Sequence, residues 1–189
     1  MEAVDAIVYD TGRDPAPGRL RLVEGFCNTV DPEHGREMLH SPDALRRVLV
    51  GLGLVEDGSP VSDADLADAL ELRAALRALA LANNGVPAPR EAEEAVERAA
   101  AAGRLGVRFE AGRAELTGTA PAVAGALATL AGIFAAAAAD GSWARLKSCR
   151  SELCGWLFYD RSRNRSARWC DMAVCGNRTK TRAYRARRA

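Results

Sequence analysis

Residues 149–175 read CRSELCGWLFYDRSRNRSARWCDMAVC and hold four of the five cysteines of the chain. The cysteines form two close pairs, Cys149 with Cys154 and Cys170 with Cys175, and 15 residues separate the pairs. Such spacing is typical of a tetrahedral zinc site, because each short loop supplies two thiolates and the longer loop brings the pairs together. It therefore predicts that Cys149, Cys154, Cys170 and Cys175 bind one Zn²⁺.

The predicted zinc is structural. A catalytic zinc usually keeps one coordination position open for water, and four thiolates leave none. The segment around the cysteines is also too short and too charged to close a core from Trp156, Phe158, Tyr159 and Trp169 alone, whereas metal binding supplies roughly 10 to 16 kcal/mol in such small units. An iron–sulfur cluster, which four thiolates also bind, is the alternative metal centre.

The near-neutral net charge of +1 hides two segments of opposite sign. Residues 145–189 carry 13 Lys/Arg against 3 Asp/Glu, a net +10, and the remaining 144 residues carry 13 against 22, a net −9. A basic segment of this density indicates a polyanionic partner, most commonly nucleic acid.

The predicted nucleic-acid contacts lie between and after the cysteine pairs. If the segment after the last cysteine is helical, the basic side chains at positions 178, 182 and 185 share one stripe, and their repulsion means that the helix should become firm only on a polyanion. The alternative is a solvated surface loop whose arginines stack on neighbouring aromatic rings. The nucleic-acid interpretation involves Arg161, Arg163, Arg165, Arg168, Asn177, Arg178, Lys180, Arg182 and Arg185.

The rest of the chain predicts a mainly α fold with a small β-hairpin (α+β). Apolar periodicity and capping residues predict helices over 41–53, 62–83, about 90–102 and about 121–139, and a helix opening within 19–29. Alternation around Ala111-Gly112 predicts the hairpin, over 104–118. We expect a helical body over residues 1–140 and a four-cysteine unit over 145–189.

Two features of the body bear on its compartment. The uncharged run 116–139 is long enough for a membrane span, but its larger apolar residues follow one helix face, which favours a buried helix. The acidic N-terminus does not resemble a secretory signal, so we expect a cytoplasmic protein with no membrane partner and reduced thiols. Cys27 is then expected to be a small buried apolar residue.

The motifs also resemble a known family. The segments RLKSC, FYDRSRNRSARWC and MAVCGNR are similar to the CGNR zinc finger, whose signature is Cys175-Gly176-Asn177-Arg178 in this chain. The segments FCNTVD and SPDALRRVLVGLGL resemble the ABATE domain that precedes this finger. Proteins of this kind are mostly bacterial and are regarded as stress-induced transcription regulators. The resemblance implies that the four cysteines bind zinc and that the finger contacts DNA.

Two functions follow as hypotheses. The first is a bacterial DNA-binding transcription regulator of the stress response, with a body that forms a homodimer or senses a signal; any small-molecule ligand of the body stays open. The alternative is an RNA-binding or ribosome-associated zinc module, because aromatics beside arginines also suit base stacking. Catalysis is not expected, since His34 and His40 belong to no recognisable catalytic or metal motif.

Overall fold

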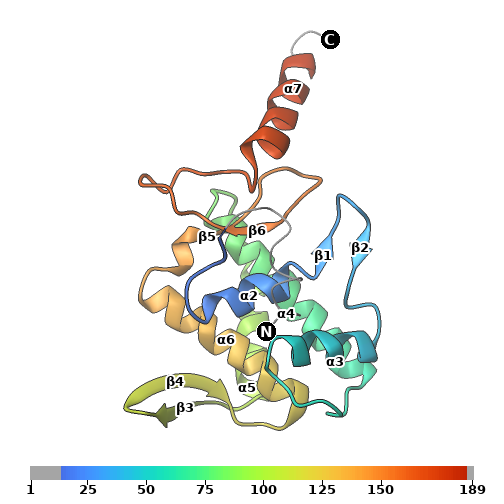
Figure 1. Ribbon diagram of the computed structural model, residues 1–189, viewed down its shortest axis with the longest axis vertical. Helices are drawn as coiled ribbons and strands as arrows, with labels where there is room; N and C mark the ends of the chain where they lie inside the picture. Colours follow the sequence, from blue (N-terminus) through green and yellow to red (C-terminus); the bar gives the residue numbers. More distant parts are fainter. Residues whose placement is uncertain (1–13, 187–189) are drawn as a thin grey trace.

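The computed structural model describes residues 14–186, except for the side chains of residues 183, 184 and 186. It confirms a mainly helical body followed by a four-cysteine region (Figure 1). The acidic N-terminus and the last residues of the basic tail, 187–189, lie outside the described part. The helices of the body are α2 (Leu20–Cys27), α3 (Pro42–Gly51), α4 (Asp63–Ala82), α5 (Arg90–Ala102) and α6 (Ala122–Ala139).

Serine caps begin the two helices that the sequence marks most clearly. Ser41 accepts a hydrogen bond from the backbone N–H of Ala44, and Pro42 occupies the first turn of α3, where a missing N–H costs nothing. Ser62 and Asp65 form a capping box at the start of α4. At 20 residues α4 is the longest helix of the described body, as its periodicity predicts.

The core lies where α2, α4, α5 and α6 meet (Figure 1). By length and composition α6 could cross a membrane, but 61% of its residues are buried inside the body. The prediction of a buried helix is therefore confirmed. The helices that supply fully buried large side chains to the core are α2, α3, α4 and α6: Val23, Phe26, Leu45, Leu49, Leu72, Leu76, Val123 and Leu130.

The predicted hairpin is present as β3 (Leu105–Glu110) and β4 (Arg113–Gly118). Its two-residue turn has positive φ at both Ala111 (48°) and Gly112 (77°), the geometry that suits the twist of a tight hairpin. Two further antiparallel pairs were not predicted: β1 (Val30–Asp31) with β2 (Arg36–Glu37), and β5 (Leu146–Ser148) with β6 (Leu157–Tyr159). These strands have so few residues each that no alternation of apolar and polar residues can be recognised in the sequence.

The cysteine region shares the core of the body. Leu146 and Leu157, on β5 and β6, are fully buried and belong to the same apolar cluster as the helices. Trp156 and Phe158 instead form a second cluster with the four cysteines. Leu157 of strand β6 thus packs in the core of the body, and the next residue, Phe158, packs against the cysteines. The body and the cysteine region are therefore joined by side-chain packing as well as by the polypeptide chain.

The carboxyl group of Glu24 is buried in the body. Glu24 on α2 is 4% exposed and accepts a hydrogen bond from the backbone N–H of Ala16 at 2.6 Å. Burial raises the pKa of Glu24 from 4.5 to about 7, although that hydrogen bond and the charge of Arg161 oppose the shift. The folded protein therefore favours the protonated form of this side chain.

Replacing Glu24 by Gln is expected to change the pH dependence of stability. A raised pKa in the folded state means that the contribution of Glu24 to stability is complete below about pH 4.5 and is lost as pH rises through 7. At pH 8 the variant should be more stable by on the order of 3 kcal/mol, and near pH 4.5 the difference should vanish. Urea titrations at both pH values measure this. Glu97→Gln, on the exposed face of α5, should show no such trend; a pH-independent difference for Glu24→Gln would contradict the buried charge.

Candidate metal centre and basic surface

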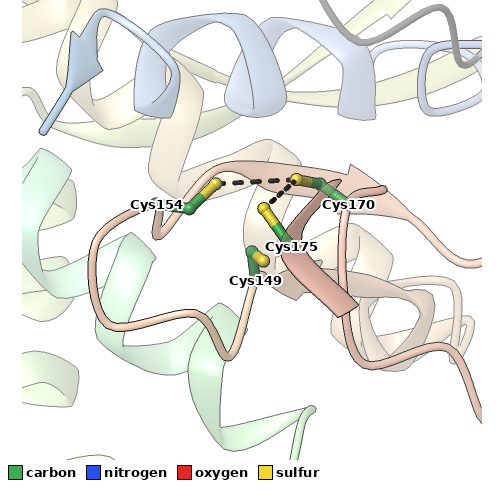
Figure 2. A group of neighbouring side chains, drawn as sticks. All are labelled: Cys149, Cys154, Cys170 and Cys175. Atoms are coloured by element: carbon green, nitrogen blue, oxygen red, sulfur yellow. Dashed lines mark hydrogen bonds between the residues drawn. The ribbon is translucent and has the colours of Figure 1, made fainter. Parts of the chain in front are cut away.

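The four predicted cysteines come together. Their Sγ atoms all lie within 4.8 Å of one another, and all four residues are buried. Figure 2 marks two contacts of the Cys170 sulfur, one with that of Cys154 at 3.5 Å and one with that of Cys175 at 3.7 Å. Four sulfurs bound tetrahedrally at about 2.3 Å from one zinc ion would lie about 3.8 Å apart, so the cluster has the size of a zinc site.

The protonation of the cluster also fits a bound cation. Hydrogen bonds from Cys154 and Cys170 lower the pKa of Cys149 below its ordinary value. The same hydrogen bonding raises the pKa values of Cys154 and Cys170, and burial with the nearby charge raises that of Cys175. More than one negative charge in the cluster is therefore costly without a cation. Zn²⁺ would supply the compensating positive charge, and the four cysteines would hold it with no position left open.

The first cysteine pair is placed by the β5–β6 hairpin. Cys149 directly follows β5, and its N–H donates to the carbonyl of Trp156 at 2.9 Å. The chain returns through Gly155, whose φ is +59°. A Cβ at this position would lie 2.7 Å from Nη2 of Arg77 on α4, so glycine permits both the left-handed backbone and the close approach of the body.

Cys175 of the second pair lies on a wide helical turn, η2 (Met172–Gly176), that runs directly into α7 (Asn177–Ala186), and Cys170 precedes this turn by two residues. The carboxylate of Asp171 caps this turn by accepting from the N–H of Val174 at 2.9 Å. Thr179 Oγ1 then donates to the carbonyl of Cys175 at 2.8 Å. The metal site therefore sets the start of α7, which extends away from the body (Figure 1).

A buried ion pair anchors the arginine-rich loop that connects the two cysteine pairs. Lys147 on β5 and Asp160 are 2.8 Å apart, with side chains 5% and 0% exposed. Lys147 also donates to the carbonyls of Arg165 and Ala167, and Asp160 accepts from the N–H groups of Ser162 and Ala167. These bonds account for the positive φ of Arg165 (51°), which is unusual for a residue with a side chain.

Most predicted nucleic-acid contacts are exposed. Arg161 is exposed but already has partners in the protein. It donates to the carbonyl of Pro15, and its Cζ lies 5.4 Å from the centroid of the Tyr159 ring, over which it stacks. Arg182 lies 3.6 Å from Glu152 in an ion pair that is largely exposed on both sides, which contributes little. The other exposed members are Arg163, Arg165 and Arg168 on the loop and Asn177, Lys180 and Arg185 on α7.

Arg178 differs from the rest, because it is half-buried and forms an ion pair with the body. Its Nη2 lies 2.6 Å from Oε1 of Glu33, in the turn between β1 and β2. The structure thus joins the arginine of the Cys-Gly-Asn-Arg sequence to an acidic residue 145 positions away. The sequence gives no signal for this contact.

Three asparagines of the body hold the cysteine region through its main chain. Asn28 Nδ2 donates to the carbonyl of Leu157 at 3.0 Å, and the N–H of Leu157 donates back to Asn28 Oδ1 at 2.8 Å. At the end of α4, Asn83 donates to the carbonyls of Trp143 and Leu146, and Asn84 to those of Ser148 and Arg168. Sequence reasoning missed these roles, since asparagine after a helix is also an ordinary stop signal.

Thr29 and Cys27, the neighbours of Asn28 in the sequence, are also part of the buried body. Thr29 Oγ1 accepts from the buried Arg73 at 2.9 Å, and Arg73 forms a two-point ion pair with Glu37 of β2. Cys27 is fully buried, and burial raises the pKa of its thiol to about 12. It is therefore an unreactive apolar residue of the core, as predicted.

Replacing Asn28 by Ala is expected to destabilise the protein by about 2 to 3 kcal/mol. The substitution removes two hydrogen bonds and leaves the N–H and carbonyl of Leu157 buried without their side-chain partner. Chemical denaturation of the zinc-loaded chain measures the loss. Asn164→Ala, on the exposed arginine loop, should change stability by less than about 0.5 kcal/mol; equal effects for the two variants would show that the asparagine contact is unimportant.

The two histidines do not come together in one site. Nδ1 of His34 lies 2.7 Å from Oδ2 of Asp31, and Nδ1 of His40 lies 3.2 Å from the carbonyl of Glu37. Each histidine bonds within its own part of the β1–β2 region. A cavity of about 240 Å³ separates the turn with Asp31, Glu33 and His34 from the sulfurs of the metal site.

Comparison with family models agrees with this geometry. Residues 20–141 match the model of ABATE, described as "Putative stress-induced transcription regulator", and residues 145–188 match the CGNR zinc finger. The cysteine cluster lies inside the second match, which supports structural zinc as its ligand. No curated protein matches the chain.

Proposed function

The chain belongs to the ABATE family, and from this premise we propose that it is a bacterial transcription regulator whose zinc finger binds duplex DNA. In this proposal Cys149, Cys154, Cys170 and Cys175 hold a structural zinc. The metal fixes the start of α7 and the ends of the arginine loop, and these two elements grip DNA phosphates. The body forms a dimer or senses a signal, and the protein acts in the cytoplasm under stress.

The observation that carries the proposal is the exposed basic surface beside the metal site. Arg163, Arg165 and Arg168 on the loop and Lys180, Arg182 and Arg185 on α7 all expose their side chains. Phosphate contacts of this kind fix the orientation of a protein on the duplex. An exposed helix such as α7 also suits the width of the major groove, where Asn177, and Asn164 from the loop, are candidates to read base edges.

Duplex DNA is favoured over single-stranded RNA by the positions of the aromatic rings. Trp156 and Phe158 are 7% and 1% exposed, and both lie under the metal site. Tyr159 is half-buried beneath Arg161, and Trp169 is half-buried against the cysteine cluster. Rings that stack on bases must present an open face, so these four are poorly placed for that role. No catalytic step is proposed for this surface.

The test is selection of random duplex DNA by the full-length, zinc-loaded protein, with excess nonspecific competitor at physiological salt. An enriched motif that is lost with Cys170→Ser and Cys175→Ser would support a zinc-dependent, sequence-specific regulator, and a palindromic motif would support a dimer. If about six phosphates are contacted, the log–log salt dependence of binding should have a slope of roughly −5. Preferential binding of single-stranded RNA, or a slope near zero, would reject the proposal.

A further inference from the structure

We propose that Glu33 of the body masks Arg178 of the finger, so that the body holds DNA binding below what the basic surface alone would give. This inference rests on the proposed function, because it concerns the regulation of the same surface. The masking contact is the 2.6 Å ion pair between the Glu33 carboxylate and the Arg178 guanidinium.

The position of Arg178 makes the contact relevant to binding. Arg178 lies in the first turn of α7 and shares one helical stripe with Arg182 and Arg185. Those two side chains are exposed, whereas that of Arg178 is 32% exposed because it turns toward the body. A DNA phosphate and Glu33 would use the same guanidinium N–H groups, so the two anions compete for Arg178.

Glu33 is carried by a turn that the body holds firmly at its base. The carboxylate of Asp31 accepts from His34 and from Arg36, which ties the turn across itself. At its end, Glu37 pairs with the buried Arg73, which also bonds Thr29. Thr29 adjoins Asn28, the residue that binds strand β6 of the finger, so one short segment connects the core, the turn and the finger.

Glu33 and the cysteine cluster line the same cavity. This cavity of about 240 Å³ is lined by Asp31, Glu33 and His34 of the turn and by Cys154, Cys170 and Cys175 of the cluster. The Glu33 side chain is itself 21% exposed. A phosphate can therefore displace it without opening the core, and a change in the body that moves the turn would release Arg178.

The experiment measures binding of full-length, zinc-loaded variants to one DNA duplex by fluorescence anisotropy over a series of salt concentrations. Glu33→Gln is expected to bind roughly fivefold more tightly, the size of one partly exposed ion pair. Its salt slope should be steeper by about 0.9, because one more phosphate contact is available. In the Arg178→Gln background the same substitution should change affinity by less than about 1.5-fold, because the masked group is gone.

The matched control is Glu56→Gln, which removes the same charge from an exposed position in the α3–α4 connection, remote from α7 (Figure 1). Equal affinities for Glu33→Gln and Glu56→Gln would overturn masking. Weaker binding by Glu33→Gln than by wild type would also overturn it, because Glu33 would then position α7 for binding.

Salt elution from heparin, a sulfated polyanion, separates this inference from the proposed function. If no variant binds DNA but Glu33→Gln elutes at higher salt than Glu56→Gln, masking stands and the DNA proposal fails. If the two variants elute together, masking fails whatever the DNA result.

Discussion

Replacing Cys170 by Ser is expected to abolish zinc binding and to unfold the finger. The sulfurs of two other cysteines lie within 3.7 Å of that of Cys170, and a serine hydroxyl is a poor substitute for a thiolate ligand. Structural zinc supplies on the order of 10 kcal/mol in such units, more than a small basic segment can replace. Metal analysis should fall from one zinc per chain to near zero, and DNA affinity should fall by at least roughly 100-fold.

The same variant should also lower the melting temperature of the helical body. Leu146 and Leu157 belong to the core of the body, so a disordered finger removes two buried leucines from it. The matched control is Cys27→Ala, the buried cysteine outside the cluster, which should keep one zinc per chain. If Cys170→Ser retained a full equivalent of zinc, the ligand assignment would be wrong. A brown wild-type protein containing iron would instead point to an iron–sulfur cluster.

Replacing Asp160 by Asn is expected to destabilise the protein by about 3 to 5 kcal/mol. The substitution leaves Lys147, whose side chain is 5% exposed, as a buried cation without its counter-charge. The arginine loop should loosen as well, because Asp160 accepts from two of its backbone N–H groups. Denaturation curves measure the stability, and hydrogen exchange of residues 160–168 measures the loop.

The pH dependence gives a second measure of the same pair. Burial by itself would raise the pKa of Asp160, but hydrogen bonds from Lys147 and Ser162 outweigh it and lower the pKa below its ordinary value. The ion pair therefore stabilises the protein above about pH 4, and this contribution is lost as the pH falls through the lower pKa of the folded state. The difference in unfolding free energy between wild type and Asp160→Asn should therefore become smaller in acid.

Two further variants test whether the effect comes from a buried unpaired charge. Asp43→Asn breaks an exposed pair with Arg46 and should cost less than about 1 kcal/mol. The double variant Lys147→Met with Asp160→Asn should recover part of the loss, because no charge remains buried. A double variant no more stable than Asp160→Asn would contradict this explanation.

The elements of the body could be predicted from local patterns. Ser41, Ser62 and the apolar stripes predict α3 and α4 because caps and helix periodicity act over a few residues. The cysteine spacing predicts the metal site for the same reason, since each pair must bend around one ion within a short loop. The opposite charges of the two segments also identify the basic surface before any contact is known.

Contacts between distant segments depended on tertiary structure. Asn28 meets Leu157 across 129 positions, and Glu33 meets Arg178 across 145. A polar side chain carries no local pattern that names its partner, because a hydrogen bond or ion pair requires only that two groups be brought within about 3 Å by the packing of other residues. The sequence by itself therefore determined the helices, the cysteine ligand set and the basic segment. The fold alone decided that the body forms hydrogen bonds with the finger and that Glu33 pairs with Arg178.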